Sequence, residues 1–460
     1  MDSSISRRGM LRAGAFAGLG IAVAGSIDAI AAPEAKALAR RAAGYGALVP
    51  DPAGILSLPQ GFSYKVIAKA GETLLESGQP SPSDPDGAAV FESRDTWAMV
   101  QNHEIGGSET YGVPALDGLT FDPGARGGTT TIVMDKKGNR LSEYVSIAGT
   151  HNNCAGGRTP WNTWITCEET EQRKGGALLE DHGWCFEVDA FDGNANLHPV
   201  PLKFLGRYAH EAIALDPANG TIYLTEDANG PHGLYYRWTP PTGFEPGKGA
   251  LRALALSEGG DTAGTLQAML CTKGTHRVAD LSEATKVGTM YKVTWVDVPD
   301  PLATTTSVRK QFAAGEVTGS RKLEGAYWGD GGAYFVASFA RASDGSKNEH
   351  DGQVWFYDPS NETVTLKSIF GVNPDPAADT NYDGPDNIAL DPNGGLILAE
   401  DGDGIQHLVG VTTAGQAYTL ARNDVSEMEF AGPTFTQDGE VLFACIQGDG
   451  YTFAITGPWK

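Results

Sequence analysis

The sequence predicts an all-β fold, a single β-propeller with loop insertions that covers residues 50–460. The chain has 60 Gly and 26 Pro among its 460 residues without a three-residue period, which excludes collagen. Its 41% hydrophobic content excludes bulk disorder. Extended helical periodicity is absent after the N-terminal segment, whereas one hairpin pattern recurs along the chain. These observations favour a propeller, which often exceeds the usual domain length as one unit.

The recurring pattern is an acidic or amide residue, an alternating apolar run, a turn on Asp, Asn or Gly, and a second apolar run. It occurs at residues 210–227, 323–338, 385–401 and 431–444. Each copy predicts a β-hairpin, because Asp-Pro or Asp-Gly turns separate strands of period two. The spacing of the copies fits one blade of roughly 40–60 residues each, with one blade skipped in the first gap.

Carboxylates occupy the same leading place in three of these copies. They are Glu211, Glu324 and Asp386. In a propeller the innermost strand of each blade faces the central channel, so these side chains are expected to converge on the axis. Converging carboxylates repel one another unless cations neutralise them. The alternative is that they are surface carboxylates at the edges of turns.

The segment 149–169 carries further donors. Cys154 lies in a tight Asn-Asn-Cys-Ala-Gly-Gly turn, and its deprotonation would need a neighbouring positive charge or a metal. The alternative for this cysteine is a buried, inert thiol. A strand from residue 161 ends in Glu168 and Glu169, which should point to opposite faces, and we expect Glu168 to face the channel. Upstream, Asn102 and Glu104 offer amide and carboxylate oxygens.

The N-terminus has the pattern of an export signal. Arg7 and Arg8 precede a weakly apolar, glycine-diluted stretch, and small residues at 29–32 offer a cleavage site. We therefore expect a twin-arginine signal at 1–32, a linker at 33–49, and a periplasmic or secreted protein; the alternative is a disordered tail. No later segment is long and apolar enough to predict a bilayer span, so no stable membrane insertion is expected after cleavage.

Charge and cysteine content limit the partners. The formal net charge of −23 argues against nucleic acid as a partner. The surplus of carboxylates suits hard cations, although solubility alone would explain it equally well. Five cysteines are an odd number for an oxidising compartment. Cys167 and Cys185 could bridge a hairpin, a question that the sequence leaves open.

These motifs resemble the PhoX family of bacterial alkaline phosphatases. The similarity covers the chain from about residue 50 to the end, and the cysteine segment is its most specific part. The matching positions are the leader, Asn102–Glu104, Gly149–Gly157, Thr159–Glu169, His210–Glu211, Glu324–Gly325, Gly384–Asn387 and Phe430–Gly439.

The resemblance implies a six-bladed propeller with ferric iron and calcium in its channel, bridged by an oxo group. It makes Cys154 a thiolate ligand of iron, with Glu211 and Glu324 completing the iron sites. It places calcium on Asn102, Glu104, Asp386, Glu400 and Asp401, and places Thr150 and Asn152 near bound phosphate. To these metal ligands the strand argument above adds Glu168. Better-known members carry Arg-Pro-Glu where this chain has Lys322-Leu323-Glu324, so Lys322 would contact the substrate as a point charge instead of a bidentate clamp.

Three functions follow as hypotheses. The first is an exported, metal-dependent phosphomonoesterase that acts as a monomer on small phosphate esters, with clustered cations stabilising charge on the phosphate and activating an oxo or hydroxide nucleophile for in-line attack. The second is another metal hydrolase on the same propeller, a phosphodiesterase or lactonase. The third is a non-catalytic, calcium-stabilised propeller. Neither a G-x-S-x-G nucleophile elbow nor a P-loop occurs in the sequence.

Overall fold

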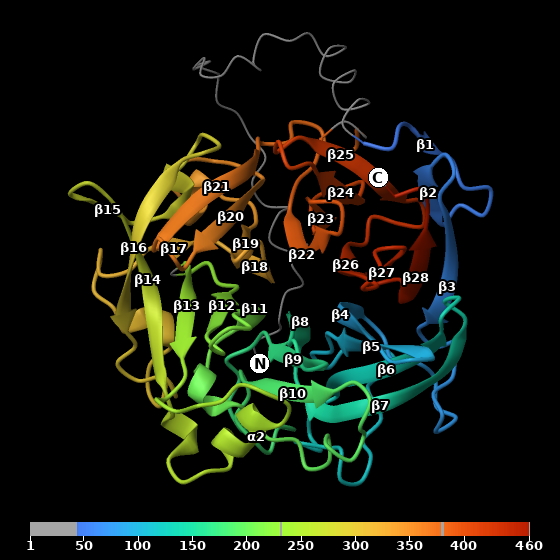
Figure 1. Cartoon of the computed structure of the whole chain (residues 1–460), viewed down its shortest axis with the longest axis horizontal. Helices are drawn as coiled ribbons and strands as arrows, with labels where there is room; N and C mark the ends of the chain where they lie inside the picture. The colour runs from blue at the N-terminus through green and yellow to red at the C-terminus, as the bar shows by residue number, and fades with distance from the viewer. Residues whose placement is uncertain (1–43, 231, 379–380, 460) are drawn as a thin grey trace.

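The computed structural model describes residues 44–230, 232–378 and 381–459, and it is built almost entirely of β-strands (Figure 1). The expected signal at 1–32 lies outside these residues, as does most of the expected linker. In the described ranges, helix is limited to α2 (Ala250–Ala255) and to short 3-10 turns at Lys203–Leu205, Gly260–Thr262, Leu281–Glu283, Val308–Lys310 and Ala342–Asp344. The all-β prediction is therefore confirmed.

The strands form antiparallel sheets that are arranged around a central axis (Figure 1). The first sheet contains β4 (Pro85–Glu92), β5 (Thr96–His103), β6 (Gly127–Asp135) and β7 (Arg140–Thr150). The second contains β8 (Asn153–Arg158), β9 (Thr163–Glu168) and β10 (Cys185–Asp189). In both sheets the strands follow one another in chain order from the axis outward, as expected for propeller blades.

The middle of the chain forms one 11-stranded sheet with an innermost strand at each end. One half contains β11 (His210–Leu215), β12 (Ile222–Glu226), β13 (Gly233–Thr239) and β14 (Thr265–Lys273), and the other contains β18 (Leu323–Gly329), β19 (Gly332–Ala337), β20 (Gly352–Asp358) and β21 (Thr363–Phe370). Strand β16 (Met290–Asp297) pairs with both β14 and β21 and so joins the halves. The short strands β15 (His276–Val278) and β17 (Gly319–Ser320) pair with β14 and β13.

The last two sheets incorporate strands from the start of the described chain. One contains β22 (Pro385–Asp391), β23 (Gly395–Glu400), β24 (His407–Val411) and β25 (Ala417–Asn423), followed by β2 (Leu56–Pro59) and β1 (Leu48–Val49). The other contains β26 (Phe430–Phe435), β27 (Val441–Ile446), β28 (Tyr451–Thr456) and β3 (Ser63–Lys69). Because β3 pairs with β28 over its whole length, the two ends of the chain close the ring.

The innermost strands β4, β8, β11, β18, β22 and β26 each pack against the next, and β26 packs against β4. Glycines allow this close approach. A Cβ on Gly87 would lie 2.6 Å from the Ala155 Cα, and one on Gly325 would lie 2.7 Å from the Asp386 carbonyl oxygen. The ring is thus a propeller-like arrangement in which neighbouring innermost strands touch through their backbones.

Every innermost strand also begins with an irregular register against its second strand. The regular pairing is interrupted between residues 85 and 88, 153 and 156, 210 and 213, 323 and 326, 385 and 388, and 431 and 434. Such a bulge leaves residues out of the ladder and redirects their side chains. The repeated bulge therefore sets the direction of the leading side chains at the same end of each blade.

Apolar packing between the two halves of the 11-stranded sheet supports the ring. Tyr235 on β13 and Phe335 on β19 stack with ring centroids 4.1 Å apart, and both side chains are fully buried. Burying a large apolar side chain stabilises the fold by about 1.5–3 kcal/mol. Within the residues that the structure describes, no helix has the length and apolar character needed to cross a membrane.

Candidate metal centre

Seven side chains at the axial end of the innermost strands form a centre that we call the acidic centre. They make three overlapping groups, and within each group the ligand atoms all lie within 4.8 Å of one another. The groups are Cys154–Glu169–Glu211, Glu211–Glu324–Asp386, and Asp386–Asp401–Glu429. Because Glu211 and Asp386 each belong to two groups, the three groups are continuous. The structure thus brings together Cys154, Glu211, Glu324 and Asp386, which are far apart in the sequence.

The position of each residue follows from the repeated hairpin. Cys154, Glu211, Glu324 and Asp386 are the second residues of β8, β11, β18 and β22, inside the bulge that turns their side chains out of the ladder. The remaining members come from strand ends: Glu169 directly follows β9, Asp401 directly follows β23, and Glu429 directly precedes β26. The acidic centre is therefore built from both strands of several hairpins.

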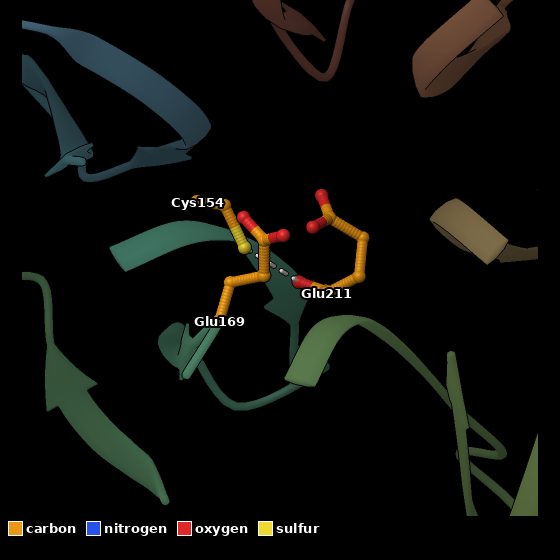
Figure 2. Close-up of side chains that lie close together, drawn as sticks. All are labelled: Cys154, Glu169 and Glu211. Carbon is orange, nitrogen blue, oxygen red and sulfur yellow. Dashed lines mark hydrogen bonds between the residues drawn. The ribbon is translucent and has the colours of Figure 1, made fainter. Parts of the chain in front are cut away.

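Cys154 provides the sulfur of the acidic centre. Its side chain is buried, and Figure 2 shows its Sγ beside the carboxylates of Glu169 and Glu211. The Sγ lies 3.3 Å from the His210 carbonyl oxygen and 3.6 Å from that of Glu211. Burial, followed by the charges of the nearby carboxylates, raises the pKa of this thiol well above its usual value. A cation between these groups would favour the thiolate, so this donor set fits a bound metal ion.

Lys322 contributes a positive charge at the edge of the acidic centre. Its Nζ lies 2.8 Å from Glu324 Oε1, 3.6 Å from Asp227 Oδ2 and 4.0 Å from Asp401 Oδ2. The residue has a φ of 47°, a conformation uncommon for a side chain with a Cβ. Arg321 instead pairs directly with Asp344, through Nε at 2.6 Å.

The structure places Glu169, and not the expected Glu168, in the acidic centre. The buried Glu168 Oε1 accepts hydrogen bonds from the His151 amide at 2.9 Å and from His182 Nδ1 at 2.7 Å. Its Oε2 accepts from the amides of Gly183 and Trp184 at 2.8 and 3.0 Å. Adjacent strand residues point to opposite faces, so the carboxylate of Glu168 meets these donors while that of Glu169 joins the acidic centre.

Glu400 differs from its expected place for the same reason. It is the last residue of β23, where its carboxylate accepts from His407 Nδ1 at 2.7 Å and from the Asp383 amide at 3.0 Å. The next residue, Asp401, belongs to the acidic centre. Glu400 therefore supports the strand end and does not belong to the three groups.

Asn102 supports the thiol segment instead of joining the acidic centre. Its Nδ2 donates to the carbonyl oxygens of Cys154 and Ala155 at 2.9 and 2.7 Å. Its Oδ1 accepts from Trp164 Nε1 at 2.8 Å. The amide thus fixes the backbone of the β8 bulge from the side of β5.

Glu104, Asn152 and Gln447 form a polar network next to the acidic centre. Asn152 Nδ2 donates to Glu104 Oε1 at 3.0 Å, and Gln447 Nε2 donates to Glu104 Oε2 at 2.7 Å. Gln447 Nε2 also lies 2.8 Å from Asp86 Oδ2. The Thr150 hydroxyl donates to Asn153 Oδ1 at 2.6 Å, so it holds the turn that carries Asn152.

Sequence reasoning missed Glu169, Glu429 and Asp86. Asp86 is the second residue of β4, the same place that Asp386 has in β22, and the signal was present in the likeness of Pro85-Asp86-Gly87 to Pro385-Asp386-Asn387. Glu429 precedes its strand by one residue and had no counterpart in the other copies.

A narrow cavity of about 60 Å³ lies along the axis next to the acidic centre. Small residues that directly follow the leading positions help to line it, among them Gly87, Ala155, Ala212 and Gly325. A site of this size can hold ordered water.

Comparisons with known proteins found a matching family model and similar solved structures. The model of the family described as alkaline phosphatase PhoX matches residues 43–142 and 139–450. The structure of Pseudomonas fluorescens PhoX in complex with vanadate, a transition state analogue, has a TM-score of 0.65 at 18% identity, over 88% of this chain and 96% of that one. A gluconolactonase from Xanthomonas campestris has a TM-score of 0.43 at 14% identity, over 90% and 98% of the two chains. A search of curated proteins found no match.

Proposed function

Because the chain belongs to the PhoX alkaline phosphatase family, we propose that it is an exported phosphomonoesterase whose metal ions are held by the acidic centre. The observation that carries this proposal is the buried thiol of Cys154 among the carboxylates of Glu169 and Glu211. Cations bound between these buried groups would offset the repulsion of their like charges. The vanadate complex of the Pseudomonas protein supports phosphate chemistry on this fold.

We assign iron to the sulfur-containing part of the acidic centre and calcium to the remainder. A thiolate among carboxylates suits ferric iron, whereas carboxylate oxygens alone suit calcium. Cys154, Glu169, Glu211 and Glu324 would hold iron, and Asp386, Asp401 and Glu429 would hold calcium. Glu104, whose carboxylate accepts from Asn152 and Gln447, would be a further calcium ligand. Bound metal ions would supply positive charge for the phosphate oxygens and activate the oxygen nucleophile.

Lys322 and Asn152 are the residues that we assign to the substrate. The Lys322 ammonium, at the edge of the acidic centre, can donate to a phosphate oxygen as a point charge. The Asn152 Nδ2, which lies 3.0 Å from Glu104 Oε1 and 3.4 Å from Glu169 Oε2, can donate a second hydrogen bond to the phosphate. Thr150 would not contact the phosphate itself. Its hydroxyl donates to Asn153 and so orients the turn that carries Asn152.

The remaining features of the proposal concern the whole molecule. The closed ring of innermost strands, each starting a hairpin, supports six blades. The paired arginines at 7 and 8 support twin-arginine export to the periplasm or beyond. We propose a monomer, with no nucleic acid partner and no stable membrane insertion after removal of the signal.

The test is hydrolysis of 4-nitrophenyl phosphate by metal-loaded protein with added calcium, together with elemental analysis and a visible spectrum. We expect turnover, bound iron, and a thiolate-to-iron absorption band that is lost in Cys154→Ala. The matched control is Cys271→Ala, which removes a buried thiol on β14 that lies in none of the three groups. Protein that binds both metals but does not hydrolyse the ester would contradict the proposal.

A second candidate function rests on Lys322. A point charge holds a dianionic monoester phosphate less firmly than a bidentate arginine does, which favours a diester, or a lactone, as an alternative substrate. A substrate panel separates the candidates: a higher kcat/KM for a diester or lactone than for the monoester would favour the second. Lys322→Arg should raise kcat/KM for the monoester if the first is correct, whereas Lys322→Ala should raise KM. Calcium binding without turnover of any substrate would point to a non-catalytic propeller.

A further inference from the structure

Two cysteines outside the acidic centre face each other across β9 and β10. Cys167 and Cys185 are directly opposite in the antiparallel register, and their Sγ atoms lie 3.7 Å apart. Both side chains are fully buried. Both are thiols in the structure, as are the other three cysteines. The pair belongs to the three-stranded sheet, in which β10 is the outermost strand.

The hydrogen bonds around this pair show which kind of cross-strand position it occupies. The Glu168 amide donates to the carbonyl of Trp184, its direct neighbour across the strands, so that neighbouring pair is hydrogen-bonded. Positions alternate along an antiparallel ladder, which makes Cys167 and Cys185 a non-hydrogen-bonded pair. In agreement, the Cys185 carbonyl points outward and accepts from the Leu202 amide at 2.8 Å.

Non-hydrogen-bonded positions bring side chains closest, with Cα atoms about 4.5 Å apart. A disulfide spans Cα separations of about 4.4–6.8 Å, so this position meets the requirement without movement of the strands. Of the other three cysteines, Cys154 lies on β8 of the same sheet, but its Sγ contacts the carbonyl oxygens of His210 and Glu211. Cys271 and Cys445 lie on β14 and β27, which belong to other sheets. Among the described cysteines, the backbone therefore favours a single pairing.

We propose that Cys167 and Cys185 form a structural disulfide, made by exchange with a low-molecular-weight disulfide such as oxidised glutathione. One cysteine sulfur attacks a sulfur of the oxidant and releases the first glutathione thiol, which leaves a mixed disulfide. The second cysteine sulfur then attacks the protein sulfur of that bond and releases the second thiol. Two electrons and two protons pass from the cysteines to the two released thiols, and one Sγ–Sγ bond remains.

The location gives the bond a consequence. It would fasten the outermost strand of the smallest sheet to β9, whose end carries Glu169 into the acidic centre. It would also close the loop of residues 168–184, which restricts the unfolded chain. Because both sulfurs are fully buried, the exchange takes place before β10 is fully packed, and the folded protein then shields the bond from reductant.

The test is refolding of the full chain with oxidised and reduced glutathione, followed by denaturation and alkylation without reductant. We expect two of the five cysteines to resist alkylation until dithiothreitol is added. Trypsin should then release residues 159–173 and 175–203, each with one cysteine, as a single disulfide-linked species. Alkylation of all five thiols, or linkage of any other peptides, would overturn the proposal.

Two controls make the result specific. Oxidation of the chain in denaturant should give a mixture of pairings, whereas refolding should give one. Dithiothreitol should lower the urea midpoint of oxidised wild-type protein and of Cys271→Ala, but should leave that of Cys185→Ala unchanged. An equal effect of dithiothreitol on Cys185→Ala would contradict the proposed pairing. The alkylation result on wild-type protein stands even if a variant fails to fold.

Discussion

Removal of the His182 imidazole tests the buried network behind the acidic centre. Its two nitrogens lie 2.7 Å from Glu168 Oε1 and 3.2 Å from Asp122 Oδ2, and all three side chains are fully buried. Burial alone would lower the pKa of His182, but the hydrogen bonds and charges of the two carboxylates raise it above its usual value. The His182 side chain thus links its own loop to Glu168. The Glu168 carboxylate also accepts a hydrogen bond from the His151 amide.

Breaking a buried ion pair by removing one partner costs about 3–5 kcal/mol. Glu168 keeps its three backbone amide donors, and Asp122 keeps those of Gly124, Leu179 and Glu180. These remaining donors place the expected loss for His182→Ala near the lower limit, about 3 kcal/mol. The measurement is the free energy of unfolding from urea titration.

The dependence on pH has a definite sign. A histidine whose pKa is raised on folding stabilises the protein fully below its unfolded value of about 6.5, and this contribution is lost as the pH rises through the folded value. The difference in stability between wild type and His182→Ala should therefore be largest in mild acid and shrink towards alkaline pH.

The matched control is His276→Ala. This histidine also lies 2.7 Å from a carboxylate, that of Glu283, but its side chain is 60% exposed. We expect a loss of at most about 1 kcal/mol, as for other exposed pairs. The reasoning is refuted if His182→Ala costs no more than His276→Ala, or if its cost does not fall as the pH rises.

Three further predictions concern the acidic centre and the ring. Glu169→Gln should lower the retained iron per folded molecule by at least about 10-fold, whereas Glu168→Gln should lower stability but leave metal content per folded molecule intact, as measured by elemental analysis. Gly87→Ala should lower the free energy of unfolding by about 1–3 kcal/mol, because the new Cβ would lie 2.6 Å from the Ala155 Cα. The control is Gly193→Ala, whose Cβ would have no heavy atom within 4 Å and which should lower the free energy of unfolding by less than about 1 kcal/mol. Chelation should lower the thermal midpoint and added calcium should restore it, because bound cations offset carboxylate repulsion; an unchanged midpoint would contradict a metal-bound centre.

The hairpins were predictable where their turns carry a strong signal. The copies at 210–227, 323–338, 385–401 and 431–444 correspond to β11–β12, β18–β19, β22–β23 and β26–β27, each with an Asp-Pro or Asp-Gly turn. The hairpin β4–β5 was not recognised because its turn contains Ser93, Arg94 and Asp95 without glycine or proline. Turn residues such as glycine and proline are the main short-range signal for a hairpin. Without them, the blade that begins with β4 could not be recognised from the sequence.

The choice of donors shows where alternation alone was insufficient. Alternation predicted that Glu168 and Glu169 point to opposite faces, and we expected Glu168 to face the channel, whereas the structure has Glu169 in the acidic centre. A comparison of the second strands of the hairpins would have indicated the right residue. Where a second strand ends in a buried glutamate, an acidic residue follows it, as in Glu226-Asp227 and Glu400-Asp401. The contribution of Lys322 could not be foreseen from alternation, because its positive φ changes the direction of its side chain.

The pairing of β3 with β28 sets the order in which the molecule can be assembled. A ribosome must release residues 451–456 before the strand at 63–69 finds its partner, so the ring can close only after the C-terminal strand has emerged. Because the donors from Cys154 to Glu429 come from several blades of this ring, closure of the ring fixes their final mutual positions. A chain shortened by its final strand would lose the junction of the ring, and with it the geometry for capturing ions, even though each of those donors was still present.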